Sequence, residues 1–195
     1  MSSGARRITD RTLLRFSDEV RTSFAFLEAL GFHCVRAEAT FVLFESSTFA
    51  INIFHGLQSY EIGLDVADAQ ASDTYSFSEI LRLLNREEAE QYRDYATHTA
   101  DGVAEAVRRL AELFRKCFDA GILEDKGQLF CRLQSQRHGI ARNRALEVQL
   151  EQARIKCEDA WRKKDFVEIV KILAPLREHL SSVELNRLEY ARKQL

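Results

Sequence analysis

The sequence is poor in the residues that interrupt or cross-link a chain. It has one proline, Pro175, and eight glycines among 195 residues, so we expect no long flexible linker. The four cysteines stand singly, and no two of them form a Cys-x-x-Cys pair. They are Cys34, Cys117, Cys131 and Cys157. This pattern favours reduced thiols over a disulfide framework or a zinc site, and we expect no metal.

Long apolar runs and a strong net charge are missing as well. No stretch approaches the roughly 18 apolar residues of a membrane span, and the first residues, MSSGARRITDRTLL, lack the apolar core of a secretory signal. The formal net charge is −2, which gives no overall attraction to nucleic acid or to anionic lipid. We therefore expect a cytoplasmic protein that does not bind membranes.

The familiar catalytic motifs do not occur either. The chain has no Walker loop, no G-x-G-x-x-G turn after a strand, no G-x-S-x-G elbow and no H-E-x-x-H helix. We therefore expect no catalytic residues and no cofactor.

What the sequence does contain is a clear hydrophobic pattern, with 46% hydrophobic and 30% charged residues. From Asp10 to Leu30 the apolar residues recur at intervals of three and four, which predicts an amphipathic helix. Gly31 follows directly, as is typical of a helix that ends in a left-handed cap.

The period then changes to two, which predicts β-strands. We expect four strands joined by short spacers, hence a four-stranded antiparallel meander. Their ranges are 32–35, 40–45, 49–55 and 59–66. The second and third strands are apolar on both faces, so both faces should be covered. The helix of residues 10–30 is expected on one face, and a segment after residue 75 on part of the other.

The second half reads as helix throughout. Ser76 with Glu79 and Ser181 with Glu184 form capping boxes, and Asn85 and Asp165 are further cap residues. Between these caps we expect helices over 100–118, 125–136 and 140–164. The fold class is therefore α+β. We expect a sheet domain of residues 1–98 and a helical region of residues 99–195 packed on it, as separate domains or as one.

Two resemblances add to this pattern. The segment of residues 153–194, with Ala160, the turn at residues 163–165, Phe166 and Pro175, resembles a tetratricopeptide-type helical hairpin. That resemblance implies helices packed against each other and a protein partner, and it transfers no binding residue. The N-terminal half is similar to small bacterial α+β domains linked to toxin immunity or phage defence.

The main candidate for a binding surface is a basic stretch. Residues 126–146 carry five Lys and Arg and no acidic residue. The candidate partner-binding residues are Arg132, Arg137, His138, Arg142 and Arg144. Such a stretch is suited to an acidic protein partner or, alternatively, to nucleic-acid phosphates. It is equally consistent with solvated charge.

A weaker candidate lies on the last predicted strand. Glu61 and Asp65 share one strand face with Gly63 between them, which predicts an open acidic groove for a cation or a basic partner. The alternative is an ordinary solvated sheet face.

These patterns lead to one hypothesis with two alternatives. We expect a non-catalytic protein that binds another protein or a second copy of itself, within a bacterial immunity or defence system. The first alternative is a nucleic-acid-binding subunit that uses the arginines of residues 132–144. The second is an enzyme of unfamiliar type with His55, Glu61 or Asp65 near a pocket at the sheet edge.

Overall fold

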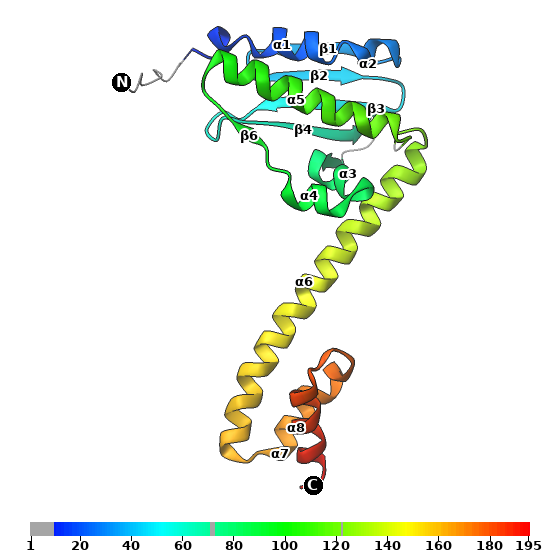
Figure 1. Cartoon of the computed structure of the whole chain (residues 1–195). Coiled ribbons are helices and arrows are strands. Elements are labelled where there is room, and N and C mark those ends of the chain that lie inside the picture. The colour runs from blue at the N-terminus through cyan, green and yellow to red at the C-terminus, as the bar shows by residue number, and fades with distance from the viewer. Residues whose placement is uncertain (1–9, 71–72, 122) are drawn as a thin grey trace, which may run out of the picture. The chain divides into compact units, whose positions relative to one another are not determined.

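The computed structural model describes residues 10–70, 73–121 and 123–195 and has an α+β fold (Figure 1). The chain divides into two compact units, Met1–Gln134 and Ser135–Leu195. Among the described residues, no helix combines the length and the apolar character that crossing a membrane requires.

The first unit opens with three short helical segments where one helix was expected. They are η1 (Arg11–Leu14), α1 (Phe16–Ser23) and α2 (Phe26–Ala29). The chain breaks at Arg15, which adopts a left-handed conformation with φ 55°. The apolar period still predicts the buried residues correctly, because Leu14, Phe16, Val20, Phe24 and Leu27 all lie in the core. Gly31 has φ 85°, so the left-handed residue after α2 is confirmed.

The antiparallel meander is confirmed, and two short strands extend it. The four long strands are β1 (His33–Glu38), β2 (Phe41–Glu45), β3 (Phe49–His55) and β4 (Glu61–Asp68). The short β5 (Thr74–Ser76) and β6 (Tyr95–Ala96) both pair with β4. The order is β1-β2-β3-β4-β5, with a bulge between Cys34 and Arg36 in the edge strand β1.

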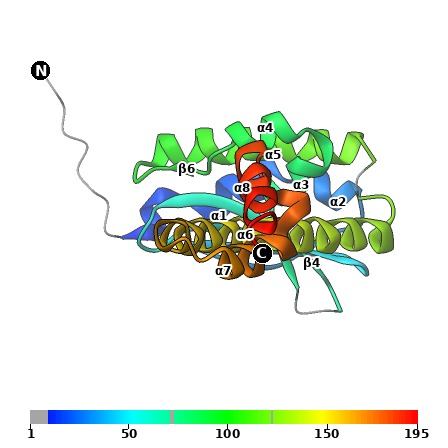
Figure 2. The ribbon, with the colours of Figure 1, turned by 90° about the horizontal axis from the view of Figure 1, so that it is seen from below.

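Helices cover one face of this sheet. Phe44, Ile51 and Val66 are fully buried there, with α1 and α5 (Ala100–Asp119) packed on them. Phe114 of α5 lies 6.3 Å from the Phe24 ring and 5.9 Å from the Phe77 ring, between ring centroids. Figures 1 and 2 show α5 on one side of the strands.

The expectation that both faces of the middle strands are covered is wrong. Phe41, Leu43 and Phe54 point away from the helices, are only half-buried, and take no part in the core of the first unit. The reason is that α1, α5 and α3 (Phe77–Leu84) all contribute to the same core, on the same face.

The connection after the sheet follows the predicted caps. Glu79 closes the capping box of α3, and Asn85 caps α4 (Arg86–Gln91) through the backbone N–H groups of Glu87 and Glu88. Since α5 packs on the sheet, it belongs to the first unit. The boundary between the two units follows residue 134, whereas the expected boundary follows residue 98.

Helix α6 (Lys126–Lys163) is continuous, so the expected interruption between residues 136 and 140 is wrong. Gly139 lies in its interior, and no atom comes within 4 Å of the position that a Cβ would take there. The first turns of α6 bury Leu129 and Leu133 in the core of the first unit.

The second unit is a small helical core around the last turns of α6. Helices α7 (Phe166–Leu173) and α8 (Ser182–Arg192), joined by η2 (Ala174–His179), pack on α6. The core residues are Cys157, Ala160, Ile169, Leu173, Leu188 and Ala191. The predicted caps Asp165 and Ser181 are confirmed, and Pro175 stands in the first turn of η2. The tetratricopeptide resemblance stays a prediction.

Candidate functional site

The uncovered face of the sheet is formed mainly by β2 and β3, and we call it the open face. It consists of Phe41, Leu43, Ala50, Asn52 and Phe54, with Arg36 of β1 on one side and Asp65 of β4 on the other. All five central residues are half-buried. The strand register places Phe41 beside Phe54 and Leu43 beside Asn52. The open face is therefore a continuous surface with an apolar centre.

This composition is unusual for a solvated sheet face. An antiparallel sheet with one covered face usually alternates apolar residues inside with polar residues outside. Here β2 has Phe41 and Leu43 on the open face and Val42 and Phe44 on the covered face. Contiguous apolar side chains that a protein leaves in contact with water commonly mark a surface for another protein.

The polar side chains at the border of the open face partly shield its aromatic residues. The Arg36 guanidinium lies 5.2 Å from the centroid of the Phe41 ring and pairs with Glu38 at 2.7 Å. Such a stacked cation is attracted to the ring face while its own charge stays in water. The β1 border of the open face therefore carries one cation and one carboxylate close together.

The predicted acidic groove at Gly63 is wrong, because the Phe54 ring lies over this glycine. A Cβ at position 63 would stand 2.5 Å from Cζ of Phe54, and Gly63 itself is buried. Glu61 is exposed and Asp65 is half-buried, on the same side of β4 as predicted. The ring fills the space that the sequence indicated as open, so the two carboxylates do not line a groove.

The basic candidate residues all lie on α6, but they do not form one face of it. With 3.6 residues per turn, Arg137 and Arg144 fall within about 20° of each other, while Arg132 lies about 140° away from Arg137. His138 and Arg142 point in a third direction around the helix axis. The Nη2 atom of Arg132 lies 3.5 Å from the Leu83 carbonyl oxygen, so this residue contacts α3 within the first unit. A single strip of phosphates would not meet all five.

The middle of α6 is nevertheless largely exposed, with a few side chains, among them Arg137 and Leu146, half-buried. None of the side chains from residue 134 to residue 152 is buried. Two apolar side chains in this part, Ile140 and Val148, are exposed to 47% and 48%. An exposed helix that mixes cations with large apolar residues resembles a surface for a protein more than one for nucleic acid.

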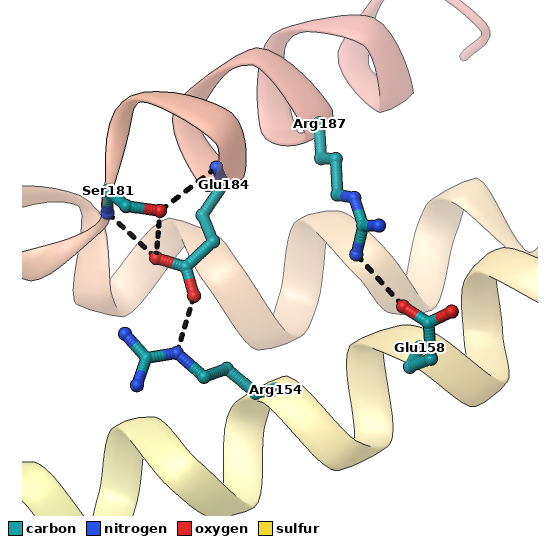
Figure 3. Close-up of polar contacts among 5 residues, drawn as sticks. All are labelled: Arg154, Glu158, Ser181, Glu184 and Arg187. Carbon is teal, nitrogen blue, oxygen red and sulfur yellow. Dashed lines mark hydrogen bonds and ion pairs between the residues drawn. The ribbon is translucent and has the colours of Figure 1, made fainter.

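A charged cluster joins α6 to α8 in the second unit (Figure 3). Arg154 donates to Glu184 at 2.6 Å, and Arg187 donates to Glu158 at 3.0 Å. Glu184 also accepts from the backbone N–H of Ser181 at 2.7 Å. The Arg154 hydrogen bond and the Ser181 bonds lower the pKa of Glu184 to about 2. A cavity of about 280 Å³ adjoins this cluster, but both of its arginines are already paired with carboxylates.

The three residues of the enzyme alternative do not converge. His55 is 1% exposed, on the covered face, where its ring packs 5.7 Å from the Phe16 ring. Asp65 lies on the open face, on the other side of the sheet. The cavity of about 400 Å³ beside Phe26 and the cavity beside Cys157 have none of His55, Glu61 or Asp65 in their walls. Within the described residues, no group of three His, Cys, Asp or Glu side chains is placed to hold a metal ion.

The sequence did contain a signal for the open face. The sequence shows Phe41 and Leu43 as apolar, but it predicts a second buried face because adjacent Val42 and Phe44 have the same character. Only the position of the helices distinguishes the two faces.

Comparison of the chain with protein-family models, with curated proteins and with solved structures finds no match.

Proposed function

We propose that this chain is a non-catalytic protein that binds another protein through the open face of its sheet. The observation that carries the proposal is the apolar centre of that face, with Phe41, Leu43 and Phe54 half-buried and outside the core. Burial of apolar area contributes roughly 25 cal/mol per Å². Three large side chains at the centre of a patch supply the apolar contact that protein interfaces use.

The exposed part of α6 provides a second contact surface for the same function. Its cations favour an acidic partner. The exposed side chains of Ile140 and Val148 add apolar contact with that partner. Membership of a bacterial immunity or defence system stays a proposal, and the identity of the partner would test it.

The experiment compares three forms of the tagged full-length chain in cells of the native host. Leu43→Glu puts a charge at the centre of the open face. The matched control is Leu57→Glu, because Leu57 is 75% exposed in the turn between β3 and β4. Quantitative mass spectrometry of the purified material identifies the proteins that accompany each form.

The proposal predicts at least one protein that accompanies the wild type and the Leu57 variant and is reduced at least tenfold with the Leu43 variant. Recovery of an untagged copy of this chain counts as such a protein. Identical sets of proteins for all three forms, with Leu43→Glu folded by circular dichroism, would reject the open face as the binding surface.

The surface on α6 has its own variant. Arg137→Glu with Arg142→Glu reverses two cations in two directions around the helix. We expect loss of an acidic protein partner and no change in DNA or RNA retention at low salt. Nucleic-acid binding that this pair abolishes would favour a nucleic-acid-binding subunit instead.

A further inference from the structure

We infer that the open face binds the open face of a second copy of this chain, so that two sheets pack face to face about a two-fold axis parallel to the strands. This inference rests on the proposed function and names the partner. Its basis is the arrangement of side chains across β1 to β4, which the strand register defines.

Side chains on the open face form rows that run across the strands, and two of these rows contain its large apolar residues. One row is Glu38, Phe41, Phe54 and Gly63, and the other is Arg36, Leu43, Asn52 and Asp65. Each row runs from β1 to β4, and the second row continues to Ser76 of β5. The apolar residues therefore lie at the centre of the face, and the second row has opposite charges on β1 and β4.

A two-fold axis between β2 and β3, parallel to the strands, turns the sheet over and reverses the order of its strands. Strand β1 then lies over β4 of the second copy, and β2 lies over β3. In the second row this brings Arg36 to Asp65 of the other copy at both ends of the interface. A contact of this kind is isologous, because the same patch serves both copies.

Charge distinguishes this axis from the other simple choice. A two-fold axis across the strands would place β1 over β1 and β4 over β4. Along the second row, such an axis would bring Arg36 onto Arg36 and Asp65 onto Asp65. Between the two rows, it would bring Arg36 onto Glu38 and Asp65 onto Gly63. Only the parallel axis brings Arg36 to Asp65 at both ends of the interface, and aligned sheets pack in this way at roughly 10 Å.

The shape of the first row agrees with the same axis. Position 41 of one copy comes to face position 54 of the other, so the centre of this row is aromatic in both copies. Glu38 comes to face Gly63, the only position in this row without a side chain, where the Phe54 ring supplies the surface. The reversed strand order thus sets Glu38 against the Phe54 ring at the border of this row, with no second charge there.

The test is a charge-reversal cycle on the purified full-length chain, followed by sedimentation velocity from about 1 to 200 µM. Arg36→Asp alone and Asp65→Arg alone are each expected to weaken the dimer at least tenfold. The double variant is expected to return the dissociation constant to within about threefold of the wild type. Arg86→Asp is the matched control, because Arg86 is an exposed arginine of the same unit with a carboxylate partner, Glu90.

Three results would overturn the inference. They are a wild type that stays monomeric at 200 µM, a dimer that Arg36→Asp does not weaken, and a folded double variant without recovery. If a charge variant does not fold, sedimentation of Leu43→Glu and of its control Leu57→Glu tests the dimer instead. Leu43→Glu should be a monomer, and Leu57→Glu should dimerise like the wild type. A monomeric wild type that still loses a host protein through Leu43→Glu rejects self-association and leaves the proposed function in place.

Discussion

At the scale of single residues, the surroundings of His55 hold its ring neutral. Its Nε2 atom lies 2.9 Å from the Thr97 carbonyl oxygen, which only accepts, so Nε2 carries the proton. Its Nδ1 atom lies 3.1 Å from Nη1 of Arg11, which only donates, so Nδ1 accepts. Burial is the largest effect and lowers the pKa of His55. The hydrogen bonds to the Thr97 and Tyr60 backbone act against it, and the positive charge of Arg11 acts with it. A second proton on the ring would face the guanidinium.

This arrangement predicts that the chain loses stability in mild acid. A lowered pKa in the folded state means that the unfolded chain binds the proton more tightly. The contribution of neutral His55 to the stability of the fold is thus complete above the ordinary histidine pKa of about 6.5. It declines as the pH falls below that value. Urea unfolding at pH 8 and at pH 5.5 measures the difference.

Two variants assign that difference to His55. His55→Gln should lower the free energy of unfolding at pH 8 by about 1–3 kcal/mol and reduce the dependence on pH. His179→Gln, at an exposed position of η2, should leave that dependence as it is. An unchanged dependence in His55→Gln would contradict the prediction.

Glu184 gives a prediction for the second unit. Glu184→Gln removes the charge that Arg154 and Ser181 bind and should cost about 1–2 kcal/mol at pH 7. The fluorescence of Trp161, the only tryptophan, reports unfolding of this unit. Because the folded-state pKa is about 2, the cost should be complete above the ordinary value of 4.5 and shrink as the pH falls towards 2.

The control for this prediction is Glu168→Gln in α7. Glu168 pairs with Lys171 at 3.3 Å, and the Lys171 side chain is 75% exposed. Exposed pairs of this kind contribute little, so the change should stay within about 0.5 kcal/mol. Equal costs for the two glutamates would show that the Arg154 contact adds no stability.

At the scale of the elements, the weak point of α6 is Gly139. Glycine in a helix interior costs about 0.5–1 kcal/mol relative to alanine, and nothing lies within 4 Å of a Cβ there. Gly139→Ala should therefore strengthen the helix by about that amount. Hydrogen exchange of the amides from residue 134 to residue 152 measures it, and faster exchange in the variant would contradict the prediction.

Gly63→Ala is the contrasting variant, because a Cβ at that position meets the Phe54 ring at 2.5 Å. We expect a loss of about 1–3 kcal/mol in urea unfolding as the ring is displaced. Unchanged stability would show that the ring moves aside without cost.

The elements themselves were largely predictable from the sequence. Alternation placed β2 and β3, and the caps Asp165 and Ser181 placed α7 and α8. The break at Arg15 was not predictable, because the left-handed conformation is usually indicated by a glycine and here an arginine adopts it. The continuous helix through Gly139 was also not predictable, because a glycine within a helical pattern commonly marks the end of a helix. Strand β6 has two residues and forms only where β4 lies beside it.

The candidate site was less predictable, because it depends on tertiary placement. The cations of residues 132–144 were identified by type, yet helix geometry spreads them around α6. The open face required knowledge of which side α5 occupies. No local pattern contains that information.

At the scale of the whole molecule, charge is unequally distributed between the two units. Residues 1–134 contain fifteen Lys and Arg against twenty-one Asp and Glu, whereas residues 135–195 contain thirteen against nine. The net charge of −2 thus conceals one acidic unit and one basic unit. Association between copies should therefore weaken with added salt more than a net charge of −2 suggests.

The exposed middle of α6 predicts where a protease cuts first. Helices without buried contacts open easily, so trypsin should cleave after Arg137, Arg142 or Arg144 before it cleaves after Arg108 or Arg109 of α5. Mass spectrometry of a timed digest identifies the sites. Early cleavage within α5 would contradict this order.

The bulge in β1 also bears on how any assembly of this chain grows. A regular edge strand offers unpaired backbone groups to the edge of another sheet, and sheets joined in that way extend into fibres. The bulge between Cys34 and Arg36 twists the edge and interrupts its pattern of donors and acceptors. In the dimer that we propose, contact through the open face uses the same patch on both copies and is complete with two. The chain therefore combines a face suited to pairing with an edge that resists polymerisation.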